Sequence, residues 1–412
     1  MRRDPGSPRS ETIPLPLQAV LGAFVCASTF TIAGTQTALG LAIVLWLLYA
    51  LKGKAGAPRR TTLELPLLLF ILATVAAALV SDERLRSLGG LKNYALISVM
   101  YVIGSLLTTR RLASRLLVVL LVSSALSAAY GIATFFLGMG EGRLGRSVGS
   151  FSNSMTLGGV LLFLCSLSCA VAIGARIGRR LRLAAAGTAL VSAGALFYSF
   201  TRSSWIGMFV SAAVMLALLR RRWLAPFAAA AVLFVILLPA PYRAQVTSIW
   251  DPKYPTNVHR LDLIRSGVGI VRDHPVMGVG THDLAEVNRR YLPPGGTPAF
   301  GHMHNIFLQV AVQMGFVGLA AFCWLLFSFY RFLARCWRLD LPPPERAWIA
   351  GSLGALSGFI ANGLFEWNFG DAEVVTLLYL AIGASAAVSR FGPPAAADPG
   401  AESAFASAPR IG

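Results

Sequence analysis

Two histidines stand two residues apart in the stretch GHMHNIFLQV, which covers residues 301–310. The whole chain has only five histidines, and an apolar run begins directly after Asn305. An imidazole accepts a proton from a hydroxyl near neutral pH, or binds a metal ion through one ring nitrogen. His302 and His304 are therefore candidates for a catalytic base or a metal site. The simpler interpretation is two surface histidines at the start of a helix.

Arginines form the second group of candidate residues. Several lie in short polar stretches between apolar runs, such as SFTRSSWIG at 199–207. A planar guanidinium binds phosphate through two hydrogen bonds and stays charged. A group of such arginines predicts an anionic ligand, whereas the simpler interpretation is a solvated loop with a few ion pairs. The arginines concerned are Arg143, Arg146, Arg202, Arg260 and Arg265.

The elements that carry these residues are predicted to be membrane helices. The chain has 412 residues, of which 56% are hydrophobic and only 13% are charged. A soluble globular protein has about 25% charged residues, so this chain has too few charges to cover a soluble surface. A β-barrel would show stretches of roughly ten residues with alternating polarity, and the sequence contains none. The composition therefore predicts an all-α polytopic protein in a lipid bilayer.

Twelve apolar runs are predicted to cross the bilayer, which takes about 20 residues per helix. The first run is expected to be retained, because a second run follows almost immediately and no small-residue cleavage site precedes a soluble domain. The predicted spans cover residues 14–33, 36–51, 63–81, 92–108, 112–138, 154–175, 183–200, 203–219, 223–241, 304–330, 346–369 and 372–389.

The distribution of charge predicts the orientation of these spans. Every second short loop is rich in basic residues, and positive charge in short loops marks the cytoplasmic side. Both termini are therefore predicted in the cytoplasm, while the candidate arginines lie on the outer side. Net charge is +18, but no aromatic residues interleave with the basic runs, so nucleic acid is not an expected partner. The predicted division is a cytoplasmic tail (1–13), nine spans (14–241), one long outer loop (242–303), three spans (304–389) and a second cytoplasmic tail (390–412).

The long outer loop has a helical pattern of its own. In residues 257–280, which end in HPVMGVG, apolar residues recur at helical spacing before Pro275 and two glycines break the helix. A second short helix is predicted over 281–294, with Thr281 as its cap. Two such helices on the membrane surface would form a lid over the outer face. The predicted apolar stripe of the first helix consists of Leu261, Ile264, Val268 and Val271.

A carboxylate is predicted close to the same outer side. The stretch LFEWNFGDAE (364–373) puts Glu366 near the outer end of the predicted span 346–369. A carboxylate inside a span costs roughly 2.5–3.5 kcal/mol on insertion scales, so it normally has a partner. Glu366 is expected either to hold one of the outer arginines through an ion pair or to contact a substrate directly.

Four of these stretches, in this order and on one side of the chain, resemble the O-antigen ligase and O-antigen polymerase superfamily. The resemblance covers mainly residues 140–310, with the Glu366 region as support. A TRSSW-like turn supplies Arg202, and an arginine ahead of an HPVMGVG-like turn is matched by Arg260, with Arg265 as its rival. The remaining matches are His304, Asn305, Leu308 and Gln309 in an HN..LQ-like motif, and Arg146 through Asn153 in an R..GSFSN-like motif.

The resemblance implies transfer of a glycan from an undecaprenyl-pyrophosphate donor at the periplasmic face of the bacterial inner membrane. In the ligase, the acceptor is a sugar hydroxyl of the lipid A–core oligosaccharide, in lipopolysaccharide biosynthesis. No nucleotide, metal or other cofactor is implied. Polymerase relatives usually carry two long outer loops, and protein O-glycosylating relatives an additional outer region near the C-terminus. This chain has one long loop and a short tail, which favours the ligase and leaves the other two open.

In such a site, His304 is the expected base for the acceptor hydroxyl. A helix N-terminus and nearby arginines disfavour imidazolium, so the imidazole stays neutral, as a base requires. A single displacement at the anomeric carbon would invert its configuration. The residues expected to bind the pyrophosphate are Arg202, Arg260, Arg265, Arg146 and Arg143. Those expected to bind or orient substrate are Asn305, His302, Glu366 and Asn153.

Other interpretations of these residues stay open. A metal ion between His302 and His304 would draw further ligands from His274, His282 or Asp283, although no dense ligand motif is present. A transporter or flippase of a lipid-linked anion would also have many spans and outer arginines. Such proteins usually bind near the midplane between internal repeats, and the sequence shows no repeat. A membrane scaffold without catalytic activity is the remaining alternative.

Overall fold

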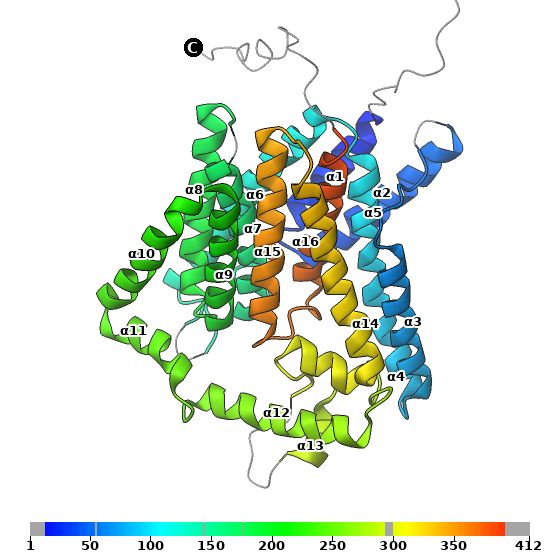
Figure 1. Cartoon of the computed structure of the whole chain (residues 1–412), viewed down its shortest axis with the longest axis vertical. Helices are drawn as coiled ribbons and strands as arrows, with labels where there is room; N and C mark the ends of the chain where they lie inside the picture. Colours follow the sequence, from blue (N-terminus) through cyan, green and yellow to red (C-terminus); the bar gives the residue numbers. More distant parts are fainter. Residues whose placement is uncertain (1–12, 54–55, 143–144, 175, 293–299, 392–412) are drawn as a thin grey trace, which may run out of the picture.

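The computed structural model describes residues 13–53, 56–142, 145–174, 176–292 and 300–391. Within these ranges all regular elements are helices, and most of them run side by side as one bundle (Figure 1). The predicted all-α architecture is therefore confirmed.

The α-helices before the long loop are α1 (Leu15–Ala27), α2 (Ile32–Leu51), α3 (Glu64–Val80), α4 (Arg84–Gly89), α5 (Ser98–Leu106), α6 (Arg110–Phe136), α7 (Ser154–Gly174), α8 (Arg179–Tyr198), α9 (Arg202–Leu219) and α10 (Leu224–Leu237). Those of the loop and after it are α11 (Ala240–Thr247), α12 (Pro255–Asp273), α13 (Ala285–Tyr291), α14 (Ile306–Trp337), α15 (Pro343–Gly363) and α16 (Ala372–Val388). Three 3-10 segments join them, η1 (Gly90–Ile97), η2 (Arg221–Trp223) and η3 (Ser248–Trp250).

Several of these helices suit a bilayer. In the described part of the chain, six are long and apolar enough to cross a membrane, namely α2, α6, α7, α8, α9 and α14. Helices α1, α3 and α16 are apolar but shorter. This set is that of a multi-pass membrane protein. Each predicted span contains helical residues, but the count of twelve crossings and their orientation stay predictions.

The predicted span 92–108 is less regular than expected. Its first part belongs to the 3-10 segment η1, and only α5 continues as an α-helix. Gly89 and Gly90 precede this segment, and the polar Lys92 and Asn93 lie exposed within it. Glycine is a weak helix former, and the exposed Lys92 and Asn93 lie in the half of η1 that comes before its buried Leu96 and Ile97. The predicted span therefore begins as a 3-10 helix and becomes α-helical only at Ser98.

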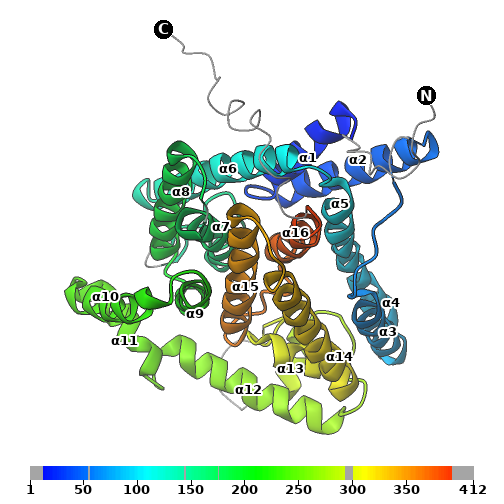
Figure 2. The ribbon, with the colours of Figure 1, turned by 45° about the horizontal axis from the view of Figure 1, so that its top comes forward.

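Helix α15 lies in the centre of the bundle, beside α7, α9 and α14 (Figure 2). Small residues along α15 allow neighbouring backbones to come close. A Cβ atom on Gly207 of α9 would lie 2.6 Å from the carbonyl oxygen of Gly358 in α15. Only glycine fits at such a contact. It fixes α9 against the centre of the bundle, and with it Arg202, the first residue of α9.

Helix α14 is interrupted at Gly315, whose backbone is left-handed with φ 61°. The break leaves the carbonyl groups of Val312 and Gln313 free of helical partners. They accept hydrogen bonds from the backbone N–H groups of Val279 and Gly280, at 3.0 and 2.9 Å. The HPVMGVG turn of the long loop is thereby docked into the break. The loop is thus anchored to the same helix that follows the two histidines.

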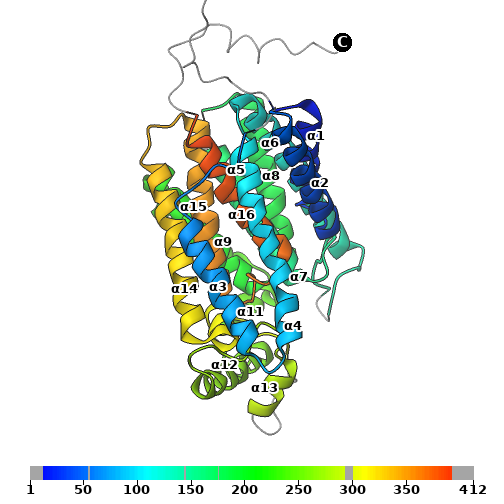
Figure 3. The same ribbon diagram turned by 90° about the vertical axis from the view of Figure 1, so that its right-hand side faces the viewer.

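Helices α11, α12 and α13 extend across one end of the bundle (Figures 1 and 3). Ile270 of α12 packs in a small apolar cluster with Leu284, Met303 and Val312. This cluster joins α12, the start of α13 and the first turns of α14. The loop therefore covers the end of the bundle at which α9 and α14 begin.

The helix predicted for the first part of the loop is confirmed as α12. Three residues of its predicted apolar stripe, Leu261, Ile264 and Val268, are 41%, 43% and 40% exposed. The contact with α14 runs through a small residue, because a Cβ atom on Gly267 would lie 2.8 Å from the side chain of Leu308. The large apolar residues that α12 buries are Leu263 and Ile270.

The second loop helix is shorter than predicted, because α13 begins at Ala285 and not at Thr281. Thr281 is not its cap: the Thr281 hydroxyl donates to the carbonyl oxygen of Ser87, at 2.8 Å. The carboxylate of Asp283 accepts from the N–H of Ala285, at 2.9 Å. The threonine therefore joins the loop to the end of α4, and the N-cap position of α13 is Leu284, which has no capping side chain.

Candidate active site

A cavity of about 350 Å³ lies where the long loop covers the end of the bundle. Its walls come from the start of α9, from η3, from α12, from the turn before α14 and from the end of α15 with the loop that follows it. Arg202, Arg260 and His304 all line it. Three candidates from distant parts of the sequence therefore meet at one cavity.

Arg202 is held in place by the long loop. Its guanidinium donates to the Ser248 hydroxyl at 2.8 Å and to the Asn257 side-chain oxygen at 3.2 Å, and it also bonds the Thr256 hydroxyl. It lies over the ring of Tyr254, 4.9 Å from the ring centroid. These neutral partners orient the arginine without neutralising its charge. Phe200, two residues earlier, has a left-handed backbone with φ 51°, which makes the sharp turn into α9.

Arg260 approaches the cavity from α12. Its guanidinium lies 6.0 Å from the centroid of the Phe365 ring. Burial lowers the pKa of Arg260, Glu366 opposes this, and the charges of Arg202 and Arg146 lower the pKa further. The lowered pKa therefore reflects mainly the burial of the guanidinium.

Neither Arg202 nor Arg260 has a carboxylate within ion-pair distance among the described residues. Arg202 is only 9% exposed. A buried charge without a counter-ion is costly. Two such arginines on one cavity wall indicate a site for an anion, and their planar forks suit phosphate oxygens.

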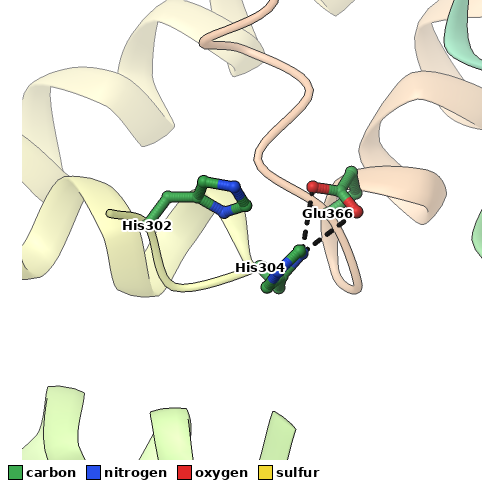
Figure 4. A group of neighbouring side chains, drawn as sticks. All are labelled: His302, His304 and Glu366. Atoms are coloured by element: carbon green, nitrogen blue, oxygen red, sulfur yellow. Dashed lines mark hydrogen bonds and ion pairs between the residues drawn. The ribbon is translucent and has the colours of Figure 1, made fainter. Parts of the chain in front are cut away.

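His304 lies in the turn before α14 and is buried. Its Nδ1 atom is 3.1 Å from each carboxylate oxygen of Glu366 (Figure 4). Its backbone is left-handed with φ 48°, a conformation that is uncommon for residues other than glycine and clusters at functional sites. The surrounding contacts therefore hold the ring in one place at some conformational cost.

Glu366 does not lie within a membrane helix, because α15 already ends at Gly363. The prediction that it pairs with an arginine is wrong, since its ion-pair partner is His304. Burial raises the pKa of Glu366, but the hydrogen bond and charge of His304, with smaller effects from His302 and the Trp367 N–H, lower it below its ordinary value. Glu366 is therefore an ionised carboxylate that faces an imidazole.

Two further histidines surround His304. The rings of His302 and His304 are 4.2 Å apart between centroids, and that of His259 lies 6.0 Å from His304. Burial and the neighbouring His304 lower the pKa of both His302 and His259. Both rings are therefore neutral near pH 7. His259 was missed in the sequence, where its only signal is its position next to Arg260.

Three side chains of this group have metal-binding atoms near one another. Single ligand atoms of His302, His304 and Glu366 lie within 4.8 Å of one another. Two of the further ligands that the sequence suggested are elsewhere: His282 bonds the Ser87 hydroxyl, and His274 is exposed at the end of α12. Asp283 lies near Gly301 but is not one of the three grouped side chains. Zinc bonds of about 2 Å put neighbouring ligand atoms roughly 3.5 Å apart. A metal ion here would have to draw the group closer together.

The motif residues after His304 shape its turn. The Asn305 side chain accepts from the N–H groups of Phe307 and Leu308, each at 2.9 Å, and so caps α14. Its amide also donates to the carbonyl oxygen of Leu364, at 2.9 Å. It forms no hydrogen bond with His304, so Glu366 and not Asn305 orients the imidazole. The buried Gln309 accepts from the N–H of Met303, at 2.7 Å, and closes the turn.

The remaining predicted site residues do not line this cavity. Arg265 is largely exposed and pairs with Asp262 at 3.2 Å, so Arg260 is the arginine of α12 that faces the cavity. Arg146 is held by Glu141 at 2.6 Å and by the Ser154 hydroxyl. Asn153 accepts from two N–H groups at the start of α7. Arg143 lies outside the described residues.

These features define an all-α membrane protein in which two arginines line a cavity beside a buried histidine–carboxylate pair. Residues 187–323 match a family model described as Wzy_C, O-antigen ligase. The match supports membership of the O-antigen ligase superfamily, as the sequence motifs predict. The matched segment contains Arg202, Arg260 and His304, but neither Arg146 nor Glu366. No curated protein matches the chain.

Proposed function

We propose that this protein is an O-antigen ligase, which transfers a glycan from undecaprenyl pyrophosphate to a sugar hydroxyl of the lipid A–core oligosaccharide. The observation that carries the proposal is the meeting of His304, paired with Glu366, and two arginines without carboxylate partners at one cavity. The glycan-transfer family supplies the reaction class. Donor, acceptor and residue roles are proposed.

The two arginines bind the donor pyrophosphate. Arg202 of α9 and Arg260 of α12 line the same cavity, so a pyrophosphate bound there would meet both forks. Hydrogen bonds from a charged donor to a charged acceptor are about twice as strong as neutral ones. They also stabilise the negative charge that develops on the leaving pyrophosphate. Apolar residues of the same wall, such as Ile206 and Ile264, suit the start of the lipid chain.

His304 acts as the base through its second ring nitrogen. The ionised Glu366 accepts from Nδ1–H, which leaves the lone pair on Nε2. The acceptor oxygen attacks the anomeric carbon, and its proton passes to Nε2. The new C–O bond forms as the bond from the anomeric carbon to the phosphate oxygen breaks, and undecaprenyl pyrophosphate leaves with the bonding electrons. The imidazolium then returns its proton to the leaving group or to water. A single displacement inverts the anomeric carbon.

The proposed setting is the periplasmic face of the bacterial inner membrane. Helices α12 and α13 of the long loop lie at one end of the bundle (Figure 1), and the cavity is lined by α12 and the start of α9. The arginine-rich connection to α10 follows the far end of α9, away from this loop. Short basic loops mark the cytoplasmic side, so the cavity would face the periplasm. This is the face at which both lipid-linked substrates would be reached. The proposed reaction needs no metal and no nucleotide.

The decisive experiment uses purified protein with a defined undecaprenyl-pyrophosphate glycan and lipid A–core, in detergent and with a chelator. A ladder of glycan on the core supports the ligase. Longer glycan still on the carrier indicates a polymerase instead, and glycan on an added acceptor protein indicates an O-oligosaccharyltransferase. No product in any arm, together with donor binding, indicates a transporter. Loss of the ladder on chelation contradicts the metal-independent reaction.

A further inference from the structure

A second cavity, of about 150 Å³, lies on the other side of the loop between α15 and α16. Its walls come from α3, η1, α14, α16 and the loop itself, with Thr281 of the long loop at its edge. It shares no lining residue with the first cavity. A volume of 10–15 Å³ holds one water, so this space has room for a group of roughly ten waters.

The loop between α15 and α16 separates the two cavities. Leu364 and Phe365 line the first cavity, whereas Trp367 and Phe369 line the second. Glu366 lies between these pairs and bonds His304. The second cavity is therefore one residue along the chain from the carboxylate that orients the proposed base.

The second cavity is aromatic and uncharged. Among the described residues that line it there is no lysine, arginine, aspartate, glutamate or histidine. Its polar side chains are the amides of Asn93 and Gln313, the hydroxyls of Tyr94, Thr281 and Tyr379, and the indole of Trp367. Its aromatic residues are Phe70, Tyr94, Trp367, Phe369 and Tyr379.

Two polar groups of this lining are left without partners in the described structure. The Tyr379 side chain is 2% exposed, and its hydroxyl forms no hydrogen bond with the described residues. The exposed Asn93 side chain likewise has no partner there. Neither group is among the enclosed polar atoms that lack a partner, so both are open to the cavity they line and can bond a ligand with hydroxyl groups.

We propose that this second cavity seats a neutral sugar ring of the acceptor glycan. A sugar has an apolar C–H face that packs on aromatic rings, and an edge of hydroxyl groups that bonds amides and tyrosines. The pyrophosphate donor does not suit a cavity without cationic residues. The arginines proposed to bind it line the first cavity. The inference rests on the proposed function for the identity of the acceptor, but the binding itself does not require catalysis.

Trp367 is the ring that the loop holds most closely. A Cβ atom on Gly370 would lie 2.0 Å from the Trp367 Nε1 atom, so the indole is folded over a glycine that leaves room for it. Its position is therefore fixed by the same loop that carries Glu366. A sugar ring packed on this indole is held beside the loop, so the linked sugar can reach His304.

The test measures binding of core oligosaccharide, released from lipid A, to the purified full-length protein without donor. Asn93→Ala and Trp367→Leu are each expected to raise the Kd at least 10-fold, whereas Leu85→Ala, a change at an exposed residue of α4, is expected to leave it unchanged. Donor binding should stay at the wild-type level in all three. Because Asn93 is exposed, its variant stays interpretable if Trp367→Leu does not fold.

Equal Kd values for wild type, Asn93→Ala and Trp367→Leu would overturn the proposal, and so would an equal loss of donor binding in the variants. The ligation reaction, run on the same samples, reports on the proposed function separately. Protein that binds core through these residues but does not ligate supports the sugar site and contradicts the ligase. If the wild-type protein ligates and the Kd for core is unchanged in the variants, the result supports the ligase and contradicts the sugar site.

Discussion

The Nδ1 atom of His304 lies 3.1 Å from both carboxylate oxygens of Glu366, across 62 residues of sequence. The pair is buried, and the turn that carries His304 is closed by Asn305 and Gln309. One ring nitrogen is therefore engaged and the other is the one available to a substrate hydroxyl. The same arrangement explains why a histidine stands in a left-handed backbone conformation.

Glu366→Gln is predicted to lower kcat for ligation at least roughly 10-fold, but by less than the ~10²–10⁴-fold that loss of a general base costs. The amide can bond Nδ1 but does not stabilise the imidazolium that forms in the reaction. Donor KM should stay near the wild-type value, because the arginines are untouched. Equal changes in kcat and donor KM would indicate a general structural defect instead.

Arg202→Lys and Arg260→Lys are predicted to weaken donor binding by roughly 10- to 100-fold each, the equivalent of one or two charge-assisted hydrogen bonds. Lysine keeps the charge but not the planar fork. Arg265→Lys is the matched control on the same helix, because that side chain is exposed and faces away from the cavity. Titration of the purified variants with labelled donor measures the donor affinity of each. Donor affinity that is unchanged in both cavity variants would exclude the arginine clamp.

Much of the fold follows from the sequence for simple reasons. Apolar runs long enough to cross a bilayer have few alternatives to a helix, so each predicted span contains helical residues. The predictions that failed concern contacts between segments. Thr281 was expected to cap the second loop helix, but its hydroxyl bonds Ser87 of α4 instead, a contact that local sequence does not reveal.

The candidate site was predictable in its residue types and not in its pairings. The motifs identify Arg202, Arg260 and His304 because each lies next to a turn signal. The partner of Glu366 was not predictable, since nothing in LFEWNFGDAE shows that its chain bends toward the turn before α14. The choice between Arg260 and Arg265 depends on the rotation of α12 about its axis, which the sequence pattern does not fix.

Gly315→Ala is predicted to destabilise the protein. The left-handed backbone alone costs an alanine about 1–2 kcal/mol, and its Cβ would lie 2.2 Å from backbone atoms of Val276. The docked HPVMGVG turn would have to move, and with it α12 and Arg260. Thermal unfolding in detergent should show a lower Tm, together with weaker donor binding. Gly22→Ala is the control, because nothing lies within 4 Å of its Cβ position; an equal drop in Tm there would contradict this account.

Asp371 is predicted to make stability depend on pH. Burial, with the charges of Glu366 and Glu373, raises its pKa to about 7. The folded state then binds more protons than the unfolded state between about pH 4 and pH 7, so this contribution to stability is lost as pH rises through 7. Asp371→Asn should therefore flatten the fall in Tm between pH 5 and pH 8. Asp340→Asn, at an exposed position, should keep the wild-type profile, and identical profiles for all three proteins would contradict the prediction.

The central claim is that His304 is the base of a glycan transfer to the acceptor hydroxyl. The most direct measurement is single-turnover ligation by wild-type protein and His304→Ala, with donor binding measured on the same samples and with His274→Ala, an exposed histidine, as control. The account predicts a loss of roughly 10²–10⁴-fold in the rate of His304→Ala, unchanged donor binding, and a wild-type rate for His274→Ala. Ligation by His304→Ala at close to the wild-type rate would contradict it.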